Sequence, residues 1–195
     1  MSYTFSRRDF MKYTALTAVA VASAGMFTGC GENPNQPSKV FNGTADVEAT
    51  FGGSTGGFMG FGAIHDKHIL LKEGTGFDAG TGTLTCAFSH RPVSEGTSCK
   101  ESNYQVLIVN DKGAQYCVHN KNGVTFTCSN PSGSIKISDA SLLPVKNTVT
   151  ITGLPLTGAK KVIVQYFPRH NALGNDKDSY ADVFASWDVS AICNL

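Results

Sequence analysis

Residues 104–128 read YQVLIVNDKGAQYCVHNKNGVTFTC, and this stretch decides the fold. Apolar and polar side chains alternate along it, and the turn sequences NDKG (110–113) and NKNG (120–123) interrupt the alternation. A period of two residues is typical of a strand with one buried face, and an Asn-to-Gly turn between such runs is typical of a hairpin. The stretch therefore predicts three consecutive antiparallel strands.

The register of both hairpins is predicted from the requirement that the apolar side chains share one face. A shift by one residue would turn every side chain to the other face. Three-residue loops, each ending in a glycine at positive φ, pair Ile108 with Tyr116 and Val118 with Phe126. In this register the large apolar side chains share one face. They are Tyr104, Val106, Ile108, Tyr116, Val118, Val124, Phe126 and Cys128.

Similar alternating runs recur along most of the chain after residue 40. The candidate strands are 45–51, 83–88, 104–109, 115–119, 124–128, 134–137, 148–152, 162–167 and 182–189. No window of twelve residues carries a helical apolar stripe. Short strands at intervals of about ten residues are typical of a sandwich or barrel. We predict an all-β, antiparallel β-sandwich of about eight or nine strands in one domain, residues 40–195.

One segment resembles a known family. Thr148-Val149-Thr150-Ile151-Thr152-Gly153-Leu154-Pro155, followed by Val162-Ile163-Val164-Gln165-Tyr166, is similar to the middle of a fibronectin type III or related immunoglobulin-like domain. The resemblance covers about twenty residues and implies an immunoglobulin-like β-sandwich. The tyrosine that opens the following strand in such domains is replaced here by Lys160 and Lys161. The fold hosts many functions, so the resemblance implies none in particular.

The charge balance excludes one class of partner. The chain has 16 Lys and Arg residues against 15 Asp and Glu residues. Proteins that bind nucleic acid carry a clustered basic excess, which this composition lacks. We therefore expect no nucleic-acid partner.

The first thirty residues have the pattern of an export signal. A basic segment is followed by an uncharged run at 13–27, which is too short and too rich in Ala and Thr for a stable membrane span. The register resembles a bacterial twin-arginine signal, which implies the twin-arginine translocation machinery as a partner. The signal residues are Arg7, Arg8, Phe10 and Lys12.

The signal ends in Phe27-Thr28-Gly29-Cys30, which resembles a bacterial lipoprotein box. The resemblance implies that Cys30 receives a lipid, whereas ordinary cleavage nearby would leave it as a thiol. Residues 31–39 are polar and contain two prolines, as in a flexible tether. The expected location is the outer face of the cytoplasmic membrane through a lipid anchor, or the medium if the chain is secreted.

Two segments carry weak candidates for metal ligands. His65 and His68 lie three residues apart and could share a metal, but a polar turn between Ile64 and Ile69 explains the segment without one. Asp176, Asp178 and Asp182 are spaced as in a calcium loop, but an alanine replaces the glycine that such a loop needs for its sharp turn. A surface loop with solvated charges is the favoured explanation, so no cofactor is predicted, and Ca²⁺ is the alternative ligand.

The cysteines imply disulfides without defining them. With Cys30 lipidated, an odd number remains, so their connectivity cannot be read from the sequence. The candidates are Cys86, Cys99, Cys117, Cys128 and Cys193. The predicted register places Cys117 and Cys128 on opposite faces, so it excludes a bond between these two.

No catalytic pattern withstands comparison with a simpler explanation. The sequence GGSTG at 52–56 matches a nucleophile elbow, but the glycines that follow it do not make the required helix. Trp187 alternates with apolar residues and is expected in the core. Candidates for a carbohydrate site are the aromatic residues that flank loops: Phe58, Phe61, Tyr166 and Phe167. We expect a binding or structural module that docks a protein or a small ligand. The alternative is an exported enzyme or an accessory protein that handles metal or calcium.

Overall fold

The computed structural model describes residues 38–52, 67–91, 97–120, 123–130, 134–135, 144–168 and 184–195. Thirteen strands and one short 3-10 helix, η1 (Glu101–Asn103), lie within these ranges, which contain no α-helix. The strands are β1 (Lys39–Val40), β2 (Val47–Glu48), β3 (Thr50–Gly52), β4 (Lys67–Asp78), β5 (Thr83–Arg91), β6 (Thr97–Ser98), β7 (Tyr104–Asn110), β8 (Gln115–Val118), β9 (Thr125–Cys128), β10 (Ser134–Ile135), β11 (Val145–Thr152), β12 (Ala159–Tyr166) and β13 (Phe184–Asp188).

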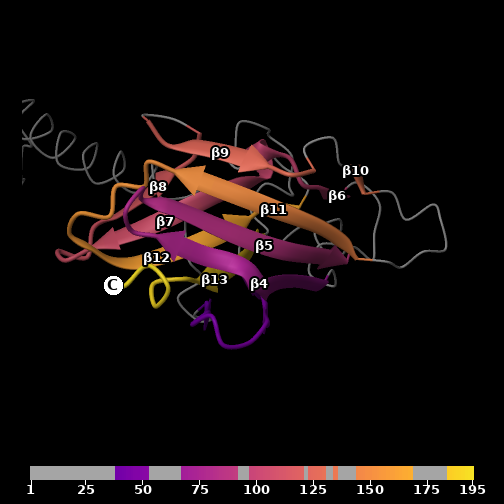
Figure 1. Ribbon diagram of the computed structural model, residues 1–195, viewed down its shortest axis with the longest axis horizontal. Coiled ribbons are helices and arrows are strands. Elements are labelled where there is room, and N and C mark those ends of the chain that lie inside the picture. Colours follow the sequence, from indigo (N-terminus) through magenta and orange to yellow (C-terminus); the bar gives the residue numbers. More distant parts are fainter. Residues whose placement is uncertain are drawn as a thin grey trace, which may run out of the picture.

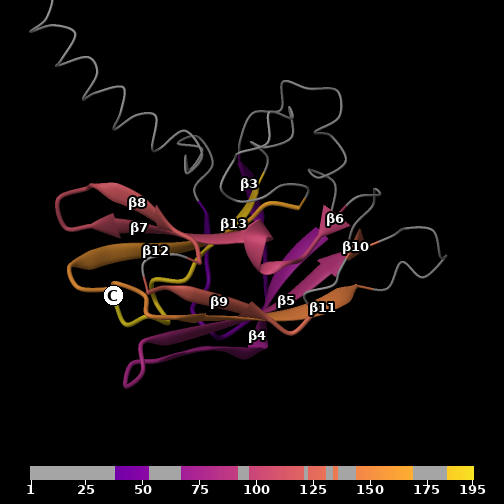
Figure 2. The same ribbon diagram turned by 90° about the horizontal axis from the view of Figure 1, so that it is seen from above.

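The strands form two layers that pack face to face, as Figures 1 and 2 show. The first sheet has the order β1-β13-β12-β7-β8, and β3 also pairs with β13. The second sheet has the order β2-β4-β5-β11-β9. A separate two-stranded ribbon joins β10 to β6. Most neighbours are antiparallel, and β1 lies parallel to β13. The prediction of an all-β sandwich is confirmed at this level.

The first predicted hairpin is confirmed in its register. Val106 lies opposite Val118 and Ile108 lies opposite Tyr116. Gly113 has a φ of +74°, as the bulged turn requires. All eight residues assigned to the apolar face belong to the main core or pack against it.

The second predicted hairpin is wrong. After β8 the chain leaves the first sheet, and β9 pairs with β11 in the second sheet, so Phe126 lies opposite Ile151 and not Val118. Asn120 and Gly123 both have positive φ, +26° and +85°, at the two ends of this crossing. The apolar face survives because Val118 and Phe126 both point into the space between the layers. Alternation records which side of a strand is buried, but not the sheet to which the strand belongs.

Two further strand predictions need correction. The expected strand 45–51 is divided into β2, which joins the second sheet, and β3, which joins the first. The longest strand, β4, was not predicted, because its charged residues and glycines hide the alternation. It tolerates them through a bulge between Leu71 and Gly76. His68 therefore lies within a strand and not in a polar turn.

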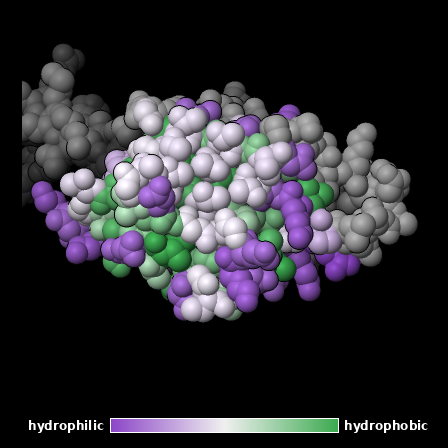
Figure 3. Space-filling model, in the orientation of Figure 1, coloured by the Kyte–Doolittle hydropathy of each residue, from purple (hydrophilic) through white to green (hydrophobic). Residues whose placement is uncertain are grey.

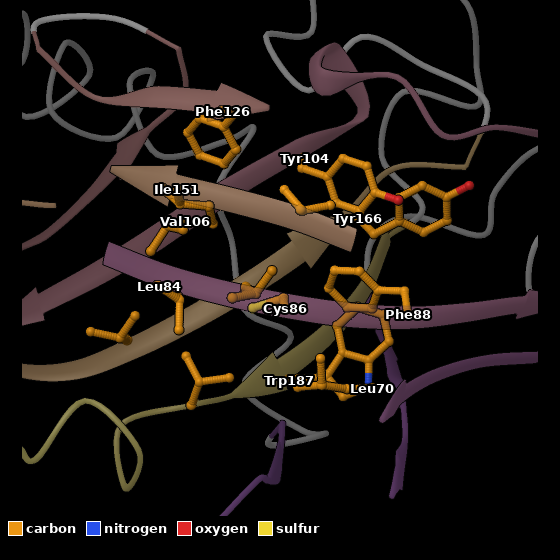
Figure 4. Packing of buried hydrophobic residues seen from close by; sticks show 14 of the residues in the cluster. Leu70, Leu84, Cys86, Phe88, Tyr104, Val106, Phe126, Ile151, Tyr166 and Trp187 are labelled. Carbon is orange, nitrogen blue, oxygen red and sulfur yellow. The ribbon is translucent and has the colours of Figure 1, made fainter. Parts of the chain in front are cut away.

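The core lies between the two sheets and is rich in aromatic residues (Figure 4). Trp187 is fully buried, as predicted, and its ring lies 4.9 Å from that of Phe88 in the opposite sheet. The indole nitrogen donates a hydrogen bond of 2.9 Å to the carbonyl of Val47. Burying a large aromatic side chain of this kind stabilises a fold by about 2–3 kcal/mol, and the hydrogen bond removes the cost of burying its polar atom.

Two glycines allow the cost of left-handed backbone to be measured apart from the cost of a steric overlap. Gly153 and Gly158 have nearly equal φ, +73° and +72°, but a Cβ at Gly153 would overlap the carbonyl oxygen of Gly123, whereas one at Gly158 would meet nothing within 4 Å. Gly158→Ala should lower the free energy of unfolding by about 1–2 kcal/mol, the cost of left-handed backbone. Gly153→Ala should lower it by about 2–5 kcal/mol, because backbone atoms must also move. Urea unfolding of both variants measures the difference, and equal losses would contradict this packing.

Candidate functional site

Two buried histidines from different strands meet at one end of the sandwich. His68 near the start of β4 lies directly opposite His90 near the end of β5. In the other sheet, Tyr104 at the start of β7 lies opposite Tyr166 at the end of β12. All four side chains are fully buried. We call these four residues, together with Asn147 of β11, the histidine–tyrosine cluster.

A chain of hydrogen bonds runs through this cluster and joins the two sheets. The Nδ1 atoms of His68 and His90 are 3.0 Å apart. His90 Nε2 lies 2.8 Å from the hydroxyl oxygen of Tyr104. Asn147 donates from its amide nitrogen to that same oxygen at 3.0 Å. Strands β4, β5 and β11 of the second sheet are thus connected to β7 of the first.

The chain of hydrogen bonds has only two self-consistent proton arrangements. If Tyr104 donates to His90, then His90 donates to His68 and the proton of His68 lies on Nε2. If His90 donates to Tyr104, every step reverses and His68 Nε2 is a bare acceptor. In both cases the chain ends at His68 Nε2, a buried atom with no hydrogen-bond partner among the residues that the structure describes.

Aromatic rings enclose the two imidazoles. The His90 ring stacks on Tyr166 with centroids 4.2 Å apart, and the His68 ring meets Tyr166 edge-on at 5.0 Å. Phe88 stacks on His90 from another side at 5.3 Å. Figure 4 shows Tyr104 and Tyr166 side by side at this end of the core. The rings exclude water and keep the local dielectric low.

Burial fixes the protonation state of the cluster. It lowers the pKa of His68 to about 3, because the charged imidazolium loses its hydration. Burial, and then the neighbouring His68, lower the pKa of His90 well below its usual value. Burial raises the pKa of Tyr104 well above its usual value. All three groups are neutral at pH 7, so none has the pKa near 7 that suits a general acid or base.

The residues proposed from the sequence are only partly brought together. His68 forms its hydrogen bond with His90, a residue that the sequence analysis did not propose as its partner. His65, Asp176, Asp178 and Asp182, like the export signal and Cys30, lie outside the described residues. Within the described ranges no group of three or more His, Cys, Asp or Glu side chains could hold a metal ion.

Of the four candidates for a carbohydrate site, Phe58 and Phe61 lie outside the described residues, and the prediction is wrong for Tyr166 and Phe167. Tyr166 is fully buried and Phe167 is 2% exposed, so neither offers a ring to a sugar. Phe167 packs on Phe184, with ring centroids 5.5 Å apart. Aromatic residues at strand ends serve the core here, because the two sheets stay in contact to the ends of these strands.

Four of the described cysteines form no disulfide. Cys86, Cys99, Cys128 and Cys193 are buried free thiols. Cys128 is free, in agreement with the prediction that it does not bond to Cys117. Cys117 packs with Leu107 and Ile163 on the face of the first sheet away from the main core.

The outer face of the second sheet is rich in threonine and uncharged at its centre. Thr85, Thr150 and Thr127 lie opposite one another on three adjacent strands. Together with neighbours on the same face they form what we call the threonine face: Thr83, Thr85, Thr125, Thr127, Thr148, Thr150 and Thr152. Figure 3 shows this face as a broad area of intermediate hydropathy with hydrophilic residues at its margins. An open groove of about 510 Å³ continues it to the bulge of β4.

Neither a known protein family, nor a curated protein, nor a solved structure matches the chain. In the part of the chain that the structure describes, no helix is long and apolar enough to cross a membrane. The pairing of His68 with His90 could not be found from the sequence, because 22 positions separate them and a missed strand holds one of them. The alternating threonines were visible, but their alignment across strands depends on the pairing of β9 with β11.

Acid should destabilise the fold through the two histidines. Their pKa values are lowered by folding, so the unfolded state binds more protons as the pH falls below about 6.5. Stability should therefore be complete above pH 6.5 and fall below it by up to about 1.4 kcal/mol per pH unit for each histidine. Urea unfolding between pH 7.5 and pH 4.5 measures this slope.

A pair of variants identifies the source of the slope. His68→Phe removes one titrating group and should reduce the dependence on pH. Tyr104→Phe removes a hydrogen bond but keeps both imidazoles, so it should lower stability at every pH and leave the slope unchanged. Equal slopes in His68→Phe and the unchanged protein would contradict this assignment.

Proposed function

We propose that the chain is an exported, lipid-anchored binding module that docks another protein on its threonine face. The composition of this face supports the proposal. Protein interfaces are depleted of charge at their centre and are polar at their rim. Here the hydroxyl groups of Thr85, Thr127 and Thr150 occupy the centre of a sheet, and the exposed charged residues Lys67, Lys72, Glu73, Asp78 and Lys146 lie on β4 or near the ends of the strands.

The path of the chain supports an orientation in which the threonine face points away from the membrane. Residue 39 ends the polar segment that follows Cys30 and begins β1. Strand β1 pairs with β13 in the first sheet, whereas the threonine face is the outer surface of the second. An anchor at Cys30 would therefore reach the domain through the layer opposite to the threonine face.

An immunoglobulin-like topology is part of the proposal. Strand β1 runs parallel to the last strand, β13, which is followed across the first sheet by β12, β7 and β8. In the second sheet β11 lies between β5 and β9. Chain crossings between layers of this kind are typical of Greek-key sandwiches. Immunoglobulin-like domains are common at cell surfaces, which agrees with such a role.

Substitution of the anchor residue should release the protein. We expect Cys30→Ala to move the protein from the membrane fraction to the soluble fraction or the medium, because one acyl-bearing residue supplies the membrane affinity. Cys193→Ser, which changes another cysteine, should stay with the membrane. Fractionation and immunoblotting measure both. Lipidation also adds mass to the chain, so the mass of the mature protein should include the lipid. Retention of Cys30→Ala in membranes would overturn the anchor.

A charge placed on the threonine face should abolish docking. Thr150→Arg puts a long cation at the centre of this face, and an unpaired charge in an interface costs several kcal/mol. Crosslinking in intact cells, followed by mass spectrometry, should lose the specific protein partner of the unchanged domain. Lys112→Glu in the exposed β7–β8 turn changes the charge away from this face and serves as the control. Equal crosslinking of Thr150→Arg and the control would contradict the proposed surface.

A further inference from the structure

Two of the four free thiols, Cys99 and Cys128, belong to segments that contact each other. Cys99 follows β6, and Cys128 ends β9 with its side chain in the main core. The Cys99 thiol contacts the carbonyl oxygen of Asn130, two residues beyond Cys128, at 3.7 Å. Asn130 is only two residues from Cys128, so this contact brings the Cys99 sulfur into the neighbourhood of Cys128, and the interaction of the two thiols that helps to raise the pKa of Cys128 agrees with this.

Side chains hold the two segments together from both directions. Asn147 donates to the carbonyl oxygen of Cys99 at 3.0 Å and accepts from the backbone nitrogen of Asn130 at 3.1 Å. Glu101, in η1, accepts from the backbone nitrogen of Cys128 at 3.2 Å. The backbone on either side of each thiol is thus fixed relative to the other, which lowers the reorganisation that a covalent bond would require.

Other pairings of Cys128 are excluded by the register. Val149 lies between Cys86 on one side and Cys128 on the other. Cys86 and Cys128 are therefore two strand spacings apart, about 9–10 Å between Cα atoms. A disulfide requires Cα atoms within about 7 Å. Cys193 lies near Cys86 instead, since its charge raises the pKa of the Cys86 thiol.

The surroundings favour a structural disulfide over a reactive thiol. Burial, and then Glu101, raise the pKa of the Cys99 thiol. The same causes, with a smaller contribution from Cys99, raise the pKa of Cys128 to about 12. Thiols of high pKa are poor nucleophiles at pH 7 and poor leaving groups from a disulfide. A bond between them would form slowly and resist reduction.

We propose that Cys99 and Cys128 form a disulfide when the protein meets an external disulfide oxidant. One thiolate attacks the oxidant and releases one of its thiols, which leaves a mixed disulfide on the protein. The second cysteine then attacks the protein sulfur of that bond and releases the other thiol. The two cysteines lose two electrons and two protons, and both pass to the oxidant. The bond fastens η1 to the end of β9, next to the histidine–tyrosine cluster, whatever the protein binds.

Peptide mapping of the full chain tests the pairing directly. The reduced protein is incubated with oxidised glutathione at pH 8, alkylated, and digested with trypsin and Glu-C without reduction. Cleavage at Glu95, Lys100 and Lys121 places Cys99 in 96–100 and Cys128 in 122–136, with Cys86, Cys117 and Cys193 in other peptides. We expect a linked pair of 96–100 and 122–136 that disappears on reduction. Absence of this pair, or linkage of Cys128 to another cysteine, would overturn the proposal.

Thermal unfolding gives a second readout. A disulfide that closes a loop of about 30 residues should raise Tm by roughly 6–12 °C in a domain of this size. The oxidised unchanged protein and the control Cys193→Ser should both show this rise over their reduced forms. Cys99→Ser and Cys128→Ser should not. If a serine variant does not fold, the peptide map of the unchanged protein still decides the pairing.

Discussion

The hydrogen bonds of Asn147 are the interaction on which this end of the sandwich depends. Its side chain is almost fully buried and contacts four groups from three segments: the Cys99 carbonyl, the Tyr104 hydroxyl, the Asn130 backbone nitrogen and the Ser129 hydroxyl. Removing the amide would take one hydrogen-bond partner from the buried Cys99 carbonyl and one from the Tyr104 hydroxyl, which keeps its contact with His90. A buried polar group left unsatisfied costs about 1–3 kcal/mol. One side chain thus holds together both sheets and the segment before η1.

The histidine–tyrosine cluster and the threonine face have different roles: the first stabilises the fold, and the second is the proposed binding surface. The histidine–tyrosine cluster lies between the layers, is neutral at pH 7 and is enclosed by rings, so it connects the sheets and offers no exposed chemistry. The threonine face lies on the outside of the second sheet, where its side chains contribute little to the core and are free to vary. The separation allows a surface to be adapted to a partner without disturbing the buried hydrogen bonds.

The sequence was most informative where contacts are local. The β7–β8 hairpin was predicted to the residue, because a short turn and a clear apolar face leave one register. The prediction failed for β9, since a strand with one buried face fits either layer. It also failed for β4, whose bulge places Lys72, Glu73 and Gly74 in a strand. The candidate site suffered from the same limit: His68 was visible as a residue, but its partner His90 lies on the strand that pairs with the missed one.

The sequence by itself determined the fold class, the buried face of most strands and the position of Trp187 in the core, because these follow from side-chain alternation within a few residues. Only the tertiary structure decided which sheet each strand joins, that His68 meets His90 and Tyr166, and that the Cys99 thiol contacts the Asn130 carbonyl. These contacts join residues far apart in the chain, and they depend on the relative free energies of alternative strand pairings. Local periodicity carries no information about that difference, since both pairings bury the same side chains.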